Sequence, residues 1–264
     1  MKLIDSLLPE RPADQSAEEW RARLELAACY RIFDHLGWTE VIFNHISLRV
    51  PTADGQTAYL INPYGLHYGE VTAHNLLKID LQGEPLAPSP YPVNRAGFVI
   101  HSAIHAARAD AHCVVHTHTD SGMAVACKRE GLRHDNFYSA SLAGRVAYHD
   151  FEGITTDTGE QQRIVASLGS HRHLVLRNHG LLATGEHVPD ALMSYWVLQR
   201  ACDVQARCDA MQGPNLTPSA EVLGAIPAQS KPMHVGTERR GQMFFDALVR
   251  KARLRAEDLL GAVG

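Results

Sequence analysis

Short apolar runs that end at turn residues alternate with segments of helical period along most of this chain, and this alternation restricts the possible fold more than any other feature. Apolar and polar residues alternate from Val41 to Val50, before Pro51, and Thr57 to Ile61 form a second β-rich run after Ala53-Asp54-Gly55, which predicts a hairpin. Strands interspersed with helices build layered α/β folds. For 264 residues, 45% of them hydrophobic, we expect one α/β domain over residues 1–264.

The other elements follow from capping and periodicity signals. Ser16 and Glu19 form a capping-box pattern, and Gly37 supplies the left-handed residue that commonly closes a helix, which predicts a helix over 17–36. Four prolines predict a loop over 85–93, and a second Pro-rich segment covers 214–232. The remaining predicted helices are 96–108, 120–128, 160–168, 189–211 and about 241–255, and the remaining predicted strands are 76–81, 111–116, 146–149 and 174–177.

Charge and cysteine content exclude several classes of partner and location. The formal net charge is −4 and no block of Lys or Arg occurs, so we expect small molecules as partners, with no nucleic acid and no membrane. The five cysteines are odd in number and none forms a C-x-x-C pair, which is typical of a reducing compartment. The N-terminal residues lack the apolar core of a secretion signal, and no apolar run approaches the roughly 18 residues that span a bilayer. We therefore expect a cytoplasmic location.

Histidine is in excess, with sixteen copies clustered in the middle of the chain. His116 and His118 stand at the end of a predicted buried strand, and residues i and i+2 of an extended chain point to the same face. His179 ends another apolar strand, and the adjacent Gly180 allows a close backbone approach. A catalytic zinc site needs three such ligands and one open position. We predict one divalent ion, preferably Zn²⁺, with Mn²⁺ or Co²⁺ as alternatives that imidazole also suits.

The histidine pair has other interpretations. Two histidines in an H-x-H pattern are often plain surface or core residues without a ligand role. The cysteines are scattered and read as small buried hydrophobes, so they offer no rival site. A cupin would want a carboxylate a few residues beyond the pair, and Asp120 is too close. A carbonic-anhydrase-like fold uses three histidines on strands, but the several predicted helices oppose it.

Six motifs occur in the order that is found in the class II aldolase/adducin family. They are Phe43-Asn44-His45-Ile46-Ser47-Leu48-Arg49, Ile61-Asn62-Pro63-Tyr64-Gly65, Val93-Asn94-Arg95-Ala96-Gly97-Phe98, Val114-Val115-His116-Thr117-His118, Ala147-Tyr148-His149-Asp150 and Leu176-Arg177-Asn178-His179-Gly180. The chain resembles this family over a core of about 20–210 and in a helical tail of about 236–256. The resemblance implies a three-layer α/β/α fold with a mostly antiparallel central sheet, zinc on His116, His118 and His179, and a homotetramer with active sites at subunit interfaces.

The chain departs from the sugar-phosphate aldolases of the family at the substrate site. The glutamate that transfers protons in those enzymes is replaced by Gly97, and the motif asparagine falls at His45. The small hydroxyl residues that precede the glutamate fall at Arg95 and Ala96. These departures resemble the adducin-like branch. By resemblance, the substrate-binding positions are His45, Gly65, Arg95 and Gly97, and Arg95 would suit a carboxylate in place of a phosphate.

We expect a metal-dependent lyase that cleaves a C–C bond in a small sugar-like or keto-acid-like substrate of carbohydrate metabolism. The alternatives are a non-catalytic adducin-like binding or structural module, and an epimerase or decarboxylase on the same scaffold. Proton transfer then needs other groups, and the candidates are His101, Asp120, Tyr138 and His149. His101 lies one helical turn beyond Gly97 and reads equally as a core histidine. Asp120 is more commonly explained as a helix cap, and Tyr138 stands where related enzymes place a tyrosine that acts across the interface.

Overall fold

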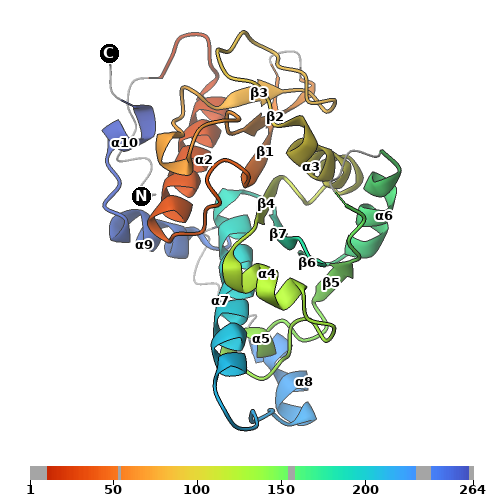
Figure 1. The fold of residues 1–264 in the computed structure, drawn as a ribbon. Helices are drawn as coiled ribbons and strands as arrows, with labels where there is room; N and C mark the ends of the chain where they lie inside the picture. Colours follow the sequence, from red (N-terminus) through yellow and green to blue (C-terminus); the bar gives the residue numbers. More distant parts are fainter. Residues whose placement is uncertain (1–10, 53–54, 154–157, 230–238, 262–264) are drawn as a thin grey trace.

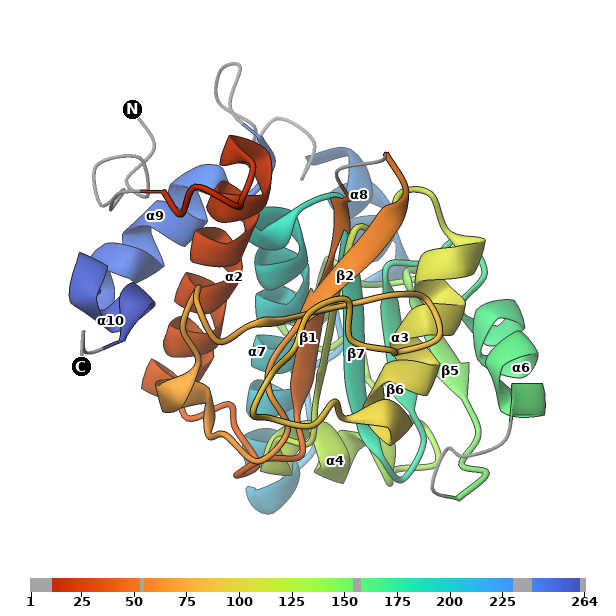
Figure 2. The same ribbon diagram turned by 90° about the horizontal axis from the view of Figure 1, so that it is seen from above.

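One seven-stranded sheet lies between two layers of helices (Figures 1 and 2). This computed structural model describes residues 11–52, 55–153, 158–229 and 239–261. The strand order is β3-β2-β1-β4-β7-β6-β5, and every neighbouring pair is antiparallel except β5 and β6, which run parallel. The strands are β1 (His45–Pro51), β2 (Thr57–Ile61), β3 (Leu77–Ile79), β4 (Cys113–Thr117), β5 (Val146–His149), β6 (His173–Leu176) and β7 (Gly180–Gly185). The prediction of a three-layer α/β/α fold with a mostly antiparallel sheet is confirmed.

Helices α2 and α7 pack on one face of the sheet, and α3 and α6 pack on the other (Figure 2). The alternation in β1 explains this division, because Ile46 and Leu48 enter the core beneath α2 and α7 while Ser47 faces α3. The helices are α2 (Ala17–His35), η1 (Tyr68–Glu70), α3 (Arg95–Ala107), α4 (Asp120–Ala126), α5 (Phe137–Ala140), α6 (Thr158–Leu168), α7 (Val188–Ala210), α8 (Ala220–Gln229), α9 (Gln242–Lys251) and α10 (Ala256–Leu260).

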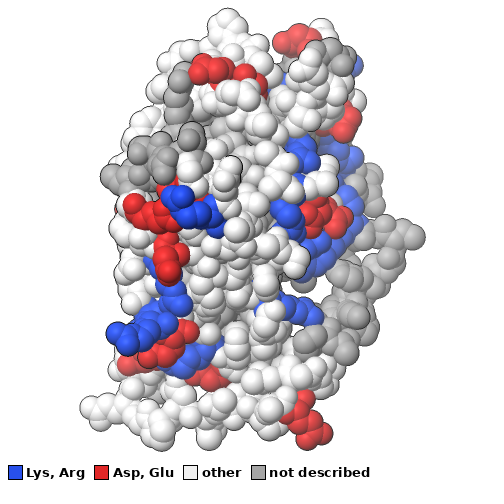
Figure 3. Space-filling view, turned by 90° about the vertical axis from the view of Figure 1, so that its right-hand side faces the viewer, with Lys and Arg blue, Asp and Glu red and all other residues white. Residues whose placement is uncertain are grey.

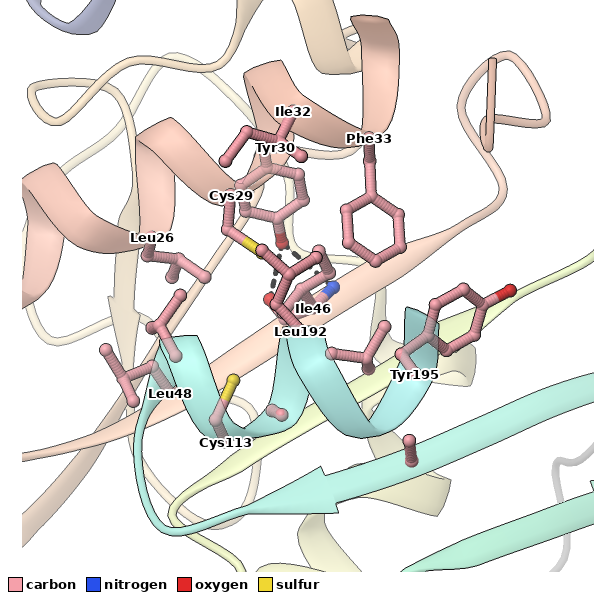
Figure 4. Close-up of a cluster of buried hydrophobic side chains, with 14 of the residues drawn as sticks. Leu26, Cys29, Tyr30, Ile32, Phe33, Ile46, Leu48, Cys113, Leu192 and Tyr195 are labelled. Atoms are coloured by element: carbon pink, nitrogen blue, oxygen red, sulfur yellow. Dashed lines mark hydrogen bonds between the residues drawn. The ribbon is translucent and has the colours of Figure 1, made fainter. Parts of the chain in front are cut away.

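Helix α2 begins and ends as its sequence predicts. The side chain of Ser16 caps it by accepting a hydrogen bond from the Glu19 N–H at 3.0 Å, and Gly37 has the expected left-handed φ of 70°. The apolar face of α2 enters the core with Cys29, Tyr30 and Phe33 (Figure 4). The buried Tyr30 hydroxyl accepts from the Ile46 N–H at 2.9 Å and donates to a β1 carbonyl, so its polar atom is satisfied and α2 is fixed to β1.

Several predicted boundaries were wrong. The first strand begins at His45, four residues after the predicted start, because Val41 has a left-handed φ of 47° and residues 41–42 form a turn. The strand predicted over 76–81 is shorter, at Leu77–Ile79. The Pro-rich segment 214–232 contains helix α8, and its last residues, 230–232, lie outside the described residues.

The C-terminal tail is two helices where one was predicted over 241–255. Helix α9 ends at Lys251, and Arg253 takes a left-handed φ of 55° before α10 begins. Residues 236–238 of the predicted tail lie outside the described residues. Strand β7 was missed, because its sequence begins and ends with glycine and directly follows the predicted end of another strand.

In the described part of the chain, no helix has the length and hydropathy needed to cross a membrane. On the face drawn in Figure 3, basic and acidic side chains lie in mixed groups that are separated by uncharged surface.

Candidate metal centre

Three histidines meet where strand β4 ends and strand β7 begins, in the middle of the sheet. His116 lies within β4 and His118 follows the end of that strand, while His179 lies in the turn between β6 and β7. Strand β7 returns antiparallel to β4 with Leu181 opposite Thr117, which brings the turn beside the β4 end. One ligand nitrogen from each histidine lies within 4.8 Å of the other two, and the Nε2 atoms of His116 and His118 are 2.8 Å apart.

The backbone around the three rings is shaped for close approach. A Cβ atom at Gly180 would overlap the carbonyl oxygen of Thr117 and lie 3.1 Å from Cδ2 of His118, so only glycine fits where β7 starts. Asn178 has a left-handed φ of 55°, which asparagine tolerates better than most residues. The tight turn that presents His179 therefore depends on both neighbours of this histidine.

Hydrogen bonds orient the ligand atoms. Nδ1 of His116 donates to the carbonyl oxygen of Leu181 at 2.9 Å, so its Nε2, which faces Nε2 of His118, carries the lone pair that an ion needs. The side-chain oxygen of Asn44 accepts from the backbone N–H of His118 at 3.0 Å and holds the residue after β4 in place. Asn44 belongs to the Phe43–Arg49 motif, but nothing in the pattern of that motif indicated this role.

Burial keeps the three histidines neutral. Burial, with smaller effects of His179 and His118, lowers the pKa of His116 well below its usual value. Burial lowers the pKa of His179 to about 4, with His118 and His149 adding to the effect, and burial also lowers the pKa of His118. Neutral imidazoles carry the lone pairs that metal ions need. Tetrahedral zinc with bonds of about 2.0–2.1 Å would place ligand nitrogens about 3.3 Å apart. The ligand nitrogens here are 2.8 Å apart in His116 and His118, and all lie within 4.8 Å of one another, so the donor set fits zinc.

His45 and Gly97 form a complementary pair beside the metal centre. His45, the first residue of β1, is buried, and its ring centroid lies 4.2 Å from that of His101 and 5.2 Å from that of His116. A Cβ atom at Gly97 would lie 2.8 Å from Cε1 of His45 and 2.9 Å from the side-chain nitrogen of Asn94. The His45 imidazole therefore occupies the space that the Cβ atom of any other residue at position 97 would need.

His101 is held away from the open part of the site. Its Nδ1 lies 2.7 Å from the hydroxyl of Ser47, which also lies 2.7 Å from Nε2 of His105, and all three residues are buried. Nδ1 of His105 in turn lies 2.8 Å from the carbonyl oxygen of Ala111. The sequence interpretation named His101 but missed Ser47 and His105. Their spacing from His45 and His101, two residues along a strand and four along a helix, was the available signal.

The other four predicted site residues lie on four different segments of the chain. Gly65 is exposed in the turn after β2 and has a left-handed φ of 97°. Arg95 is the first residue of α3, and its side chain lies outside the described part of the structure. Asp120 is exposed in the first turn of α4 and lines an open cavity of about 420 Å³ that none of the three metal histidines lines. Tyr138 lies on α5, with the guanidinium of Arg200 5.7 Å from its ring centroid.

A small cavity joins His179 to a histidine and a carboxylate. It has a volume of about 10 Å³, roughly the space for one water, and its lining includes His179, His149, Phe151 and Glu160. Nε2 of His149 lies 3.7 Å from a carboxylate oxygen of the buried Glu160. His149 was among the candidates from the sequence. Glu160 was not, because an acidic residue in the first turn of a helix is ordinary.

Comparison with known proteins agrees with this architecture. The family model described as Class II Aldolase and Adducin N-terminal domain matches residues 24–206. A Pseudomonas aeruginosa protein, named as a candidate aldolase class 2 protein, is 41% identical over 256 residues, which are 95% of this chain and 96% of that protein. Alpha-adducin of Rattus norvegicus is 45% identical over 194 residues, which are 72% of this chain but 26% of that protein. This chain therefore matches about a quarter of the length of alpha-adducin.

Solved structures show the same fold over nearly the whole chain. An aldolase II superfamily protein from Pseudomonas syringae has a TM-score of 0.84 at 38% identity, with 98% of this chain and 99% of that chain covered. L-fuculose 1-phosphate aldolase from Glaciozyma antarctica has a TM-score of 0.79 at 25% identity, with the same coverage of both chains. Together with the family match and the three converging histidines, these likenesses show that the chain belongs to the class II aldolase and adducin family.

Proposed function

We propose that this protein is a metal-dependent lyase that cleaves a C–C bond in a small sugar-like or keto-acid-like substrate, as a zinc-dependent aldehyde-lyase of the class II aldolase type. One observation carries the proposal: ligand nitrogens of His116, His118 and His179 lie within 4.8 Å of one another. His118 and His179 are only partly buried, so solvent reaches part of the cluster. A catalytic metal site needs such an open position.

The chain's residues have separate roles in this proposal. His116, His118 and His179 hold the ion, which when bound supplies a Lewis acid that polarises a substrate oxygen. His45 and Gly97 shape the adjoining substrate space, and Gly65 and Arg95 are its further proposed binding residues. Gly97 cannot move a proton. We assign proton transfer to His149 and Glu160, which line one cavity with His179, and not to Asp120, which lines a different one.

The proposal includes a homotetramer in the cytoplasm, with Tyr138 acting on the site of a neighbouring subunit. The buried, free Cys29, Cys113 and Cys202 fit a reducing compartment. The exposed Phe137 beside Tyr138 is the kind of apolar side chain that a subunit contact would cover.

Metal content tests the ligand assignment. Elemental analysis of purified protein should find about one zinc, manganese or cobalt ion per chain, and H116A and H118A should each lose it. His112 is exposed and close to His116 in sequence, so H112A is the matched control and should keep the ion. Full metal retention in H116A and H118A would refute the assignment.

Catalysis is tested by screening sugar phosphates, aldonates and β-keto acids with the metal-loaded protein. Cleavage that is abolished in H179A and reduced at least tenfold in E160Q would support the lyase and the assigned proton-transfer group. Turnover without C–C cleavage would point instead to the epimerase or decarboxylase alternative.

A non-catalytic binding module is the second candidate, and Gly97 is the observation that favours it. This position lacks an ionisable side chain, and the adducins match the chain closely in sequence. Ligand-dependent increases in melting temperature, without turnover of any ligand that binds, would support this module over the lyase.

A further inference from the structure

One face of helix α3 lies over the residues of β1 that point away from α2 and α7. Gly97, His101 and His105 follow one another at intervals of four residues along α3, so they share one helix face. His45 and Ser47 are two residues apart on β1 and point toward that helix face, as the contacts of Gly97 with His45 and of His101 with Ser47 show. The result is a buried column of polar groups that ends beside the metal centre.

Only one assignment of donors and acceptors satisfies all the hydrogen bonds of this column. A carbonyl oxygen can only accept, so Nδ1 of His105 carries a proton and donates to Ala111. Burial lowers the pKa of His105 to about 3, so the ring is neutral near pH 7 and its Nε2 must accept from the Ser47 hydroxyl. The Ser47 oxygen then accepts from His101, whose Nδ1 carries the proton. Nε2 of His101 is left as an acceptor.

Three buried nitrogens at the end of the column lack a hydrogen bond of normal geometry among the described residues. They are Nε2 of His101 and both ring nitrogens of His45, whose side chains are at most 2% exposed; the backbone at Gly97 and Phe43 acts on the His45 ring only electrostatically. Burying such groups without partners costs about 1–3 kcal/mol each. The two rings lie 4.2 Å apart between centroids at an interplanar angle of 42°, so they are in contact without a hydrogen bond between them.

We propose that the column from Ala111 through His105, Ser47 and His101 is a tautomer lock: its hydrogen bonds fix the proton of His101 on Nδ1, and the lone pair on Nε2 of His101 then positions His45. His101 accepts the N–H of His45 after the His45 ring turns, and His45 then presents its second nitrogen to the ligand as a fixed acceptor. The site therefore selects a ligand with a hydroxyl group next to the metal-binding oxygen, and it disfavours a second anionic oxygen at that point. Ser47, His101 and His105 are positioning residues. The predicted ligand preference rests on the proposed metal-dependent function, whereas the predicted tautomers of His101 and His105 do not depend on it.

Nuclear magnetic resonance of the full-length chain labelled with ¹⁵N at histidine tests the lock directly. Imidazole nitrogens that carry a proton are distinguished from those with a lone pair by their shifts, and H101Q and H105Q assign the signals. We expect the proton on Nδ1 in both His101 and His105, with or without zinc. A His101 that is protonated on Nε2 would overturn the lock. Since this readout needs neither metal nor substrate, it stands apart from the test of the proposed function.

A ligand pair tests the consequence for selectivity. Glycolate and acetate differ in one hydroxyl, so zinc-loaded protein should bind glycolate more tightly, and S47A should weaken glycolate by about tenfold while leaving acetate unchanged. S47T keeps the hydroxyl and should restore the preference, and both variants should keep their zinc. An unchanged glycolate-to-acetate ratio in S47A would overturn the proposal. If S47A does not fold, the tautomers of the wild-type protein decide the matter.

Discussion

Gly97 is the residue that we propose stands in place of a catalytic glutamate, and its surroundings leave no room for a side chain. A Cβ at this position would lie under 3.0 Å from both His45 and Asn94. We expect G97A to lower the free energy of unfolding by about 1–3 kcal/mol, because the well-packed His45 must move. Gly224 of α8 has nothing within 4 Å of an added Cβ, so G224A is the control and should stabilise by up to about 1 kcal/mol. Urea unfolding measures both.

The contact between His45 and position 97 predicts that the substitutions H45A and G97A affect stability non-additively. Removing the His45 ring opens the space beside position 97, so G97A should cost less in an H45A background. The coupling should be about 0.5–3 kcal/mol in a double-mutant cycle measured by urea unfolding. Additive effects would show that His45 does not limit position 97. Introducing a glutamate at position 97 therefore requires replacing His45 as well, and G97E alone should disturb the site.

Buried histidines also predict how stability depends on pH. Burial lowers the pKa of His105 to about 3 and that of His173 to about 4. The unfolded chain, with a histidine pKa near 6.5, binds protons first, so this stability is present above about pH 6.5 and is lost as the pH falls toward 4. Each histidine should cost about 2 kcal/mol by pH 5. Urea unfolding should show this decline, and H173Q should flatten it.

At the scale of elements, the sequence predicted what depends on local pattern. Strand β4 and its paired histidines follow from apolar content and two-residue spacing, and α2 follows from its caps. Helix α8 was missed because prolines at 214, 218 and 227 suggested a loop. The contact of His101 with Ser47 could not be predicted, because it depends on how α3 is placed over β1, and residues 54 positions apart in sequence carry no local signal of that placement.

The connection between α7 and the tail helices depends on one buried carboxylate. Asp190, in the first turn of α7, has a side chain only 2% exposed and pairs with Arg172 at 2.7 Å and with Arg240, just before α9. We expect D190N to destabilise the protein by about 3–5 kcal/mol, because it leaves two arginines poorly compensated. Limited proteolysis should then release the tail first.

Glu186 provides the matched control for this prediction. It pairs with the same Arg172 at 3.0 Å, but its side chain is 60% exposed. E186Q should therefore cost no more than about 1 kcal/mol in urea unfolding. Equal effects of D190N and E186Q would show that burial of Asp190 does not determine its contribution.

At the scale of the whole molecule, the proposed homotetramer should depend on apolar side chains that this single chain leaves uncovered. Phe137 of α5 is 86% exposed and lies next to Tyr138, the residue proposed to act on a neighbouring subunit. An exposed Phe adds nothing to the core of its own chain, whereas burial between subunits would contribute about 1.5–3 kcal/mol per copy. We expect F137S to lower the mass measured by sedimentation and to reduce catalysis with it. Leu216 is 91% exposed elsewhere on the chain, so L216S removes a comparable apolar side chain and should leave both properties unchanged. A wild-type chain that sediments as a monomer at micromolar concentration would contradict the tetramer, and Tyr138 would then have no neighbouring site on which to act.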